Sequence, residues 1–191
     1  MIDYDICKEK LKSILSEKRF IHSVNVSRAA EKLAVRYGTD AEKAKIAGLL
    51  HDVCKEMDEK TLSELLSEAK PELFNAFKKF PFKLYHGPVA TVYLKKEFGI
   101  DDEEILNSIC FHTTGHKNMT VMEEIIFVAD DISDERPFDN LKELQALSLE
   151  NINLVAIQKC TWAIQKCLNK RITIHPYTVE TYNDMIEKEG N

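Results

Sequence analysis

Apolar residues recur at helical spacing from one end of the 191-residue sequence to the other. Alternating patterns typical of half-buried strands are nearly absent, and only RITIH, residues 171–175, looks strand-like. The periodicity therefore predicts an all-α fold. The expected helices cover residues 4–17, 20–37, 40–56, 59–69, 72–79, 86–98, 101–113, 120–132, 139–146, 150–169 and 177–188.

The chain is expected to form one domain over residues 1–191. No internal repeat, low-complexity tract or long linker divides the sequence, and 44% of its residues are apolar, enough for a full hydrophobic core. The helix expected at 150–169 carries further apolar residues, which could cover the core or pair with a second copy of the chain in a homodimer. Both uses of this helix remain open.

Charge and cysteine content narrow the class of ligand and the compartment. A net charge of −6 argues against a broad nucleic-acid or anionic-membrane surface, because such partners require a basic field. Five cysteines without a CxxC motif indicate reduced thiols, and neither a signal peptide nor a membrane span is evident, so a cytoplasmic location is expected. An anionic ligand would need local positive charge, which metal ions could supply.

Several polar side chains fall on apolar helix faces. His22 shares a stripe with Val26 and Leu33, and the same spacing test places His51, His112 and Asp130 inward. A single inward histidine is more often a hydrogen-bonded core residue, and one His-Asp dipeptide is close to chance. Their coincidence favours a metal site, because imidazole and carboxylate together bind Zn, Fe, Mn, Co or Ni.

The order of these residues resembles a known pattern. His22, the pair His51-Asp52, and Asp130 resemble the H...HD...D motif of the HD-domain metal-dependent phosphohydrolase superfamily, which is all-helical. His86 in LYHGPVA and His112 in CFHTTG are similar to the additional ligands of its binuclear members. The resemblance therefore implies a helical bundle around a binuclear metal site.

A narrower resemblance covers about residues 19–136. The segments RFIHSVNV, GLLHDVCK, YHGPVA, HTTG and FVADDISDER are similar to the YqeK family of symmetrical diadenosine tetraphosphate hydrolases. Relatives tend to have Ile-Glu-Pro after the last aspartate, whereas this sequence reads Ile132-Ser-Asp-Glu-Arg136. The helices expected over residues 139–188 carry no functional motif.

This resemblance implies a ligand set and a reaction. One metal would be bound by His22, His51, Asp52 and Asp130, and the other by His86, His112 and Asp52, which bridges them. Iron is the cation that the resemblance suggests, with Mn, Co, Ni and Zn as alternatives. The implied reaction is hydrolysis of diadenosine tetraphosphate to two ADP by a metal-bridging hydroxide, without a serine or cysteine nucleophile.

Other residues are candidates for binding or catalysis beside Asp52. Lys55 follows His51 by one helical turn, and Arg136 could clamp a phosphate. Both could equally be solvated surface cations, and His116 could be a general acid, a phosphate contact or an exposed loop residue. The substrate-binding prediction comprises Lys55, Thr113, Thr114, Gly115, His116 and Arg136. His175 is expected to be structural or exposed.

Two alternative functions remain. The chain could be an HD phosphohydrolase acting on a mono-, tri- or cyclic nucleotide, because the ligand set would look alike. It could also be a nucleotide-binding regulatory module with a vestigial centre. Retention of all six candidate ligands argues against the module, since a site that only binds would not need Asp52.

Overall fold

The computed structural model describes residues 2–190, and these residues form eleven α-helices and no strand. Two short segments differ from α-helix: a 3-10 turn, η1 (Phe82–Leu84), and a π-helical turn, η2 (Leu94–Phe98). The all-α prediction is confirmed, whereas the strand-like RITIH segment is wrong as a strand and forms a loop. The α-helices are α1 (Tyr4–Ile14), α2 (Glu17–Tyr37), α3 (Ala41–Leu50), α4 (Glu59–Ser67), α5 (Pro71–Phe77), α6 (His86–Tyr93), α7 (Glu103–Phe111), α8 (Val121–Ile132), α9 (Leu141–Glu150), α10 (Ile152–Lys170) and α11 (Pro176–Gly190).

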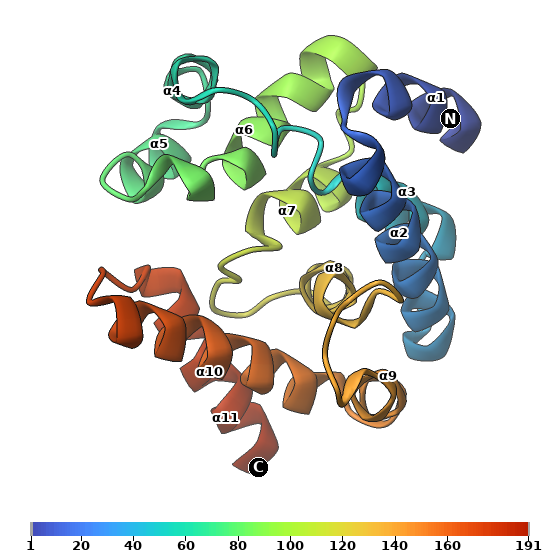
Figure 1. Ribbon diagram of the computed structural model, residues 1–191, viewed down its shortest axis with the longest axis vertical. Coiled ribbons are helices and arrows are strands. Elements are labelled where there is room, and N and C mark those ends of the chain that lie inside the picture. The colour runs from blue at the N-terminus through green and yellow to red at the C-terminus, as the bar shows by residue number, and fades with distance from the viewer. Residues whose placement is uncertain (1, 191) are drawn as a thin grey trace.

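Helix α8 lies at the centre of the bundle, where Figure 1 shows it nearly end-on. It contacts α2, α3, α7, α9 and α10, and nine of its twelve residues are buried. A capping box begins the helix: the Thr120 side chain accepts from the Glu123 amide, and the Glu123 carboxylate accepts from the Thr120 amide. This central helix carries Asp130 in its last turn.

Helix α3 ends earlier than its apolar pattern predicted. The expected helix over 40–56 stops at Leu50, and residues 51–56 form tighter turns. The Val53 amide donates to the Leu50 carbonyl and the Lys55 amide to the Asp52 carbonyl, so the bonds span three residues instead of four. His51 and Asp52 therefore lie on this turn, beyond the end of the regular helix.

Two glycines allow the ligand-bearing helices to approach closely. A Cβ atom added to Gly48 of α3 would lie 2.9 Å from the Ser27 Cα of α2, and one added to Gly87 of α6 would lie 2.4 Å from the Cys110 carbonyl oxygen of α7. Any larger residue would push these helix pairs apart. Close packing of α2 on α3 and of α6 on α7 thus draws four ligand-bearing segments together.

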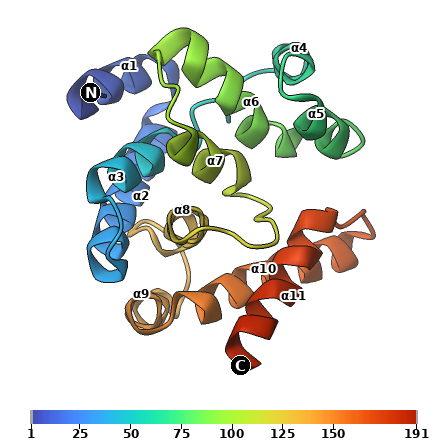
Figure 2. The same ribbon diagram turned by 180° about the vertical axis from the view of Figure 1, so that it is seen from behind.

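The C-terminal helices form a hairpin beside this core. Helices α10 and α11 pack on each other, and α10 also contacts α8 and α9. Figure 2 shows the hairpin from behind, with the chain ends on opposite sides of the molecule. Among the described residues, no helix is both long enough and apolar enough to cross a membrane.

Candidate metal centre

Five helices bring the six predicted ligands to one buried place. His22 comes from the second turn of α2, His86 begins α6, and Asp130 lies near the end of α8. The remaining ligands lie just past helix ends: His51 and Asp52 after α3, and His112 after α7. All are buried except Asp130, which is half-buried.

Asp52 lies between two pairs of imidazoles. Its Oδ2 atom is 3.8 Å from His22 Nε2 and 3.5 Å from His51 Nε2. Its Oδ1 atom is 3.3 Å from His86 Nε2 and 3.5 Å from His112 Nε2. Each carboxylate oxygen thus faces its own histidine pair, which is the arrangement that a ligand shared by two cations requires.

Asp130 places a second carboxylate beside the histidine pair formed by His22 and His51. Its Oδ1 atom is 3.1 Å from His22 Nε2 and 3.7 Å from His51 Nε2. Ligands bound at about 2.1 Å to a tetrahedral ion lie about 3.4 Å apart. The separations in this cluster are close to that value, so these atoms could surround a metal ion with little movement.

Unsatisfied atoms and fixed ring orientations also fit metal binding. Three buried atoms, His22 Nε2, His51 Nε2 and Asp52 Oδ1, have no hydrogen-bond partner, a costly state unless another ligand is bound. The opposite ring nitrogens of three histidines donate to backbone carbonyls, which leaves each Nε2 lone pair directed into the cluster. These bonds join His51 Nδ1 to Gly48 O (2.8 Å), His86 Nδ1 to Lys83 O (2.9 Å) and His112 Nδ1 to Ile109 O (2.7 Å).

His22 differs from the other histidines because its Nδ1 atom bonds a carboxylate, that of Glu135. Glu135 also accepts from the Ser133 hydroxyl (2.7 Å) and the Asn25 amide (2.6 Å). A carboxylate behind a ligating imidazole fixes the ring and increases its basicity. The loop segment from Ile132 to Arg136 therefore supports a predicted ligand.

The protonation states of His86, His112 and Asp52 suit metal binding. Burial lowers the pKa of His112 to about 3 and also lowers that of His86, with the Lys55 charge adding to the effect. Burial would raise the pKa of Asp52, but the facing imidazoles, His51 foremost, hold it well below its usual value. Neutral imidazoles and an ionised carboxylate are the forms that bind metal ions. At His22, burial lowers the pKa of the imidazole, but the bonds to Asp130 and Glu135 outweigh it and raise that pKa.

Three partly exposed cations lie at the edge of the cluster, against Asp52 and Asp130. Arg19 Nη1 donates to Asp52 Oδ2 at 2.7 Å, and Lys55 Nζ lies 3.0 Å from His86 Nε2 and 3.5 Å from Asp52 Oδ1. Arg136 donates to the carbonyl and the carboxylate of Asp130. The predicted residues Lys55 and Arg136 therefore contact the cluster directly, and all three side chains are partly exposed at its edge.

The loop after His112 contacts the ligand cluster at its first residue and helix α11 at the next two. The Thr113 hydroxyl lies 3.2 Å from His86 Nε2 and 3.1 Å from His112 Nε2, at the cluster. Thr114 is buried and its carbonyl accepts from the Thr181 hydroxyl of α11. Gly115 has φ +62°, and a Cβ atom there would lie 2.4 Å from Thr181 Oγ1. Of these three predicted substrate contacts, only Thr113 is placed against the ligands.

His116 and His175 lie away from the cluster. His116 Nε2 is 3.1 Å from Glu123 Oε1, and its ring packs on Phe111. This placement gives no support to the predicted catalytic role of His116. His175 is buried, stacks on Phe77 and accepts from the Tyr177 amide at the start of α11, which agrees with a structural role.

Three residues that contact predicted ligands were not identified from the sequence: Arg19, Glu135 and Lys159. Arg19 precedes His22 by one helical turn, a spacing that could have identified it. Lys159 occupies the buried stripe of α10 with Val155 and Ala156, where an unpaired lysine would be costly. Glu135 lies in an irregular loop, and no sequence period indicates its direction.

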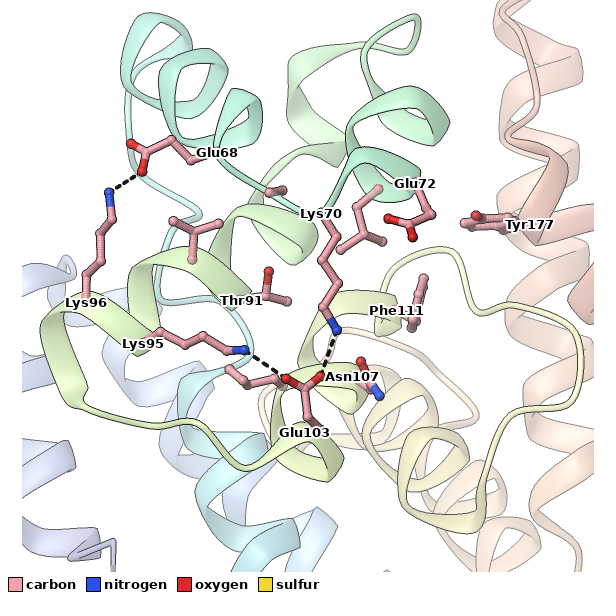
Figure 3. A pocket seen from close by; sticks show the side chains of 14 residues that line it. Glu68, Lys70, Glu72, Thr91, Lys95, Lys96, Glu103, Asn107, Phe111 and Tyr177 are labelled. Carbon is pink, nitrogen blue, oxygen red and sulfur yellow. Dashed lines mark hydrogen bonds and ion pairs between the residues drawn. The ribbon is translucent and has the colours of Figure 1, made fainter.

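A cavity of about 470 Å³ lies elsewhere, between α5, α6, α7 and the start of α11 (Figure 3). Phe111 and Tyr177 line it together with charged residues that pair with one another. Lys70 and Lys95 both bond Glu103, and Lys96 bonds Glu68. None of the six predicted metal ligands lines this cavity.

Comparison with known proteins agrees with the geometry. The HD domain family model matches residues 19–134, more than half of the chain. The chain is 34% identical over 176 residues to a symmetrical bis(5'-nucleosyl)-tetraphosphatase of Halalkalibacterium halodurans, covering 92% of this chain and 93% of that protein. The chain belongs to the HD-domain family of symmetrical bis(5'-nucleosyl)-tetraphosphatases.

Other similar proteins match nearly the full length of the chain as well. The Bacillus subtilis protein of that name is 33% identical, with 92% of this chain and 94% of that protein covered. A crystal structure from Clostridium acetobutylicum, described as a predicted HD superfamily hydrolase involved in NAD metabolism, is 35% identical and superposes with a TM-score of 0.88 over 98% of this chain and 99% of that chain. The similarity thus includes the C-terminal helices, which the HD domain match does not reach.

Proposed function

We propose that this chain is a metal-dependent phosphoric anhydride hydrolase that cleaves diadenosine tetraphosphate symmetrically, adding water to give two ADP. The observation that carries the proposal is the position of Asp52, whose two oxygens face separate histidine pairs. The names of the family members supply the substrate. Iron is the first candidate for both ions, and Mn, Co, Ni or Zn could replace it.

The cluster would hold two metal ions through the six predicted ligands. His22, His51 and Asp130 would bind one ion, His86 and His112 the other, and Asp52 both. Such ions, when bound, neutralise phosphate oxygens and acidify water for attack on phosphorus. The Nδ1 hydrogen bonds to Gly48, Lys83, Ile109 and Glu135 would keep the imidazoles in place during this reaction.

Positive side chains at the edge would bind the polyphosphate. Arg19, Lys55 and Arg136 now bond groups that metal ions would engage, so their donors would become available to substrate. Thr113 could donate its hydroxyl from the same side. Local cations explain how a chain with net charge −6 could bind a highly anionic substrate.

A substrate panel tests this function. Metal-loaded protein is incubated with diadenosine tetraphosphate, adenosine mono- and triphosphates, cyclic AMP and NAD, and the products are separated by chromatography. The proposal expects ADP as the sole product of the tetraphosphate and much slower turnover of the others. Absence of tetraphosphate turnover, or release of AMP and ATP, would contradict it. Preferred turnover of another nucleotide would support the general HD phosphohydrolase alternative.

A further inference from the structure

Lys159 reaches the proposed metal centre from α10, outside the HD domain match. Its side chain is about 10% exposed. The ammonium donates to the Phe127 carbonyl at 2.6 Å, lies 4.5 Å from the Phe127 ring centroid, and is 3.3 Å from Asp130 Oδ2. It also lies 3.5 Å from Asp131 Oδ2. A buried ammonium is thus fixed on several sides.

The two oxygens of Asp130 have different neighbours. Oδ1 faces the Nε2 atoms of His22 and His51, whereas Oδ2 faces Lys159. A free carboxylate can rotate and exchange its oxygens. An ammonium fixed to the α8 backbone holds one oxygen away from the cluster and leaves the other directed toward the histidines.

We propose that Lys159 is a positioning residue that presents Asp130 to one of the two metal ions, so that the C-terminal hairpin completes the centre. This inference rests on the proposed metal centre. Arg136 does not replace Lys159: its side-chain bond is to Oδ1, the oxygen that the proposed ion would engage, and its other bond is to the Asp130 carbonyl.

Loss of Lys159 should therefore weaken one metal site and spare the other. The site formed by His22, His51, Asp52 and Asp130 would lose its oriented carboxylate. Among the described residues, no hydrogen bond or ion pair joins His86, His112 or Asp52 to α10. Removal of a group that orients a metal ligand typically lowers metal affinity by about 10- to 100-fold.

The experiment is a Co²⁺ titration of the metal-free full-length protein, followed by visible absorption. Wild type should bind two ions, and Lys159→Met should bind one of them about 10- to 100-fold more weakly. Lys166→Met, an exposed change on the same helix, is the matched control and should titrate as wild type. Equal two-site binding by Lys159→Met would overturn the inference.

A second variant separates positioning from stability, since Lys159→Met removes the buried cation that pairs with both Asp130 and Asp131. In Lys159→Met/Asp131→Asn, one charge of each sign is removed and Asp130 is retained. Positioning predicts that the weak Co²⁺ site persists in the double variant even when its unfolding midpoint returns to the wild-type value. Recovery of both sites in that variant would overturn the inference. Wild type binding no Co²⁺ would overturn the metal centre itself.

Discussion

At the residue scale, Asp52 connects both halves of the proposed centre. It is 2% exposed and faces four imidazoles and the ammonium of Lys55. A buried carboxylate of this kind is stable only when positive charge lies close to it. In the described structure Arg19 and Lys55 supply that charge, and the proposal gives the same role to two metal ions.

Asp52→Ala should abolish metal binding and hydrolysis together, because both ions lose a ligand. Metal content after dialysis and ADP release are the two measurements. Asp101→Ala, an exposed aspartate outside the cluster, is the control and should match wild type. Full metal occupancy with turnover in Asp52→Ala would refute the bridging role.

Lys55→Met should separate metal binding from phosphate binding. Lys55 contacts the ligand cluster but is about a third exposed, so its removal leaves all six ligands present. We expect normal metal content and a loss of kcat/KM of about 100-fold, the usual size for removal of one charged contact to a reacting group. Lys60→Met, on the exposed surface, provides the comparison. Unchanged kcat/KM would exclude the phosphate role.

The ion pair of His116 and Glu123 should contribute stability only within a pH window. Burial lowers the pKa of His116, but the facing carboxylate outweighs burial and raises that pKa. Burial raises the pKa of Glu123, but the bond to His116 outweighs burial and lowers that pKa. The stability that comes from the raised pKa of His116 is fully present below about pH 6.5 and is lost as the pH rises through the pKa of the folded state. The stability that comes from the lowered pKa of Glu123 is present above about pH 4.3 and is lost as the pH falls through the pKa of the folded state.

Urea unfolding tests this window. His116→Gln should lower the free energy of unfolding by about 0.5–1 kcal/mol near pH 5.5 and by much less near pH 8.5. Glu123→Gln, which keeps a capping group, closes a double-mutant cycle. A destabilisation independent of pH would show that His116 acts through packing on Phe111 instead.

At the element scale, helix ends decide where the ligands lie. The sequence predicted the helices but extended 40–56 through His51 and Asp52, because apolar periodicity continues there while the backbone tightens into turns. The predicted boundary between the first two helices was also shifted. Helix α1 ends at Ile14, and α2 begins after Ser16, whose side chain accepts from the Arg19 amide. Periodicity identifies a buried face, but capping bonds fix the ends.

Gly87→Ala tests the close packing of α6 on α7. The added methyl would lie 2.4 Å from the Cys110 carbonyl oxygen, so the helices must separate. We expect a loss of about 1–3 kcal/mol in the free energy of unfolding together with weaker metal binding, since His86 begins α6 and His112 directly follows α7. Gly190→Ala, where nothing lies within 4 Å, is the control. Wild-type stability in Gly87→Ala would refute this packing argument.

At the scale of the whole molecule, the centre combines residues that are far apart in the sequence. Inward histidines and aspartates indicated a shared site, because helical spacing shows which face is buried. The supporting contacts of Glu135 and Lys159 depend on a loop and on α10, whose positions follow from tertiary packing. Spacing could therefore predict that His22, His51, His112 and Asp130 face inward, whereas Asp52 and His86 were added by the family resemblance. The supports could not be predicted in either way.

Asp52 is proposed to join two metal ions in one centre. Metal-free protein is loaded with two equivalents of Mn²⁺ and measured by electron paramagnetic resonance. A bridged centre should give the spectrum of a magnetically coupled ion pair, which Asp52→Ala should abolish. A wild-type spectrum containing only isolated Mn²⁺ ions would contradict the bridged centre.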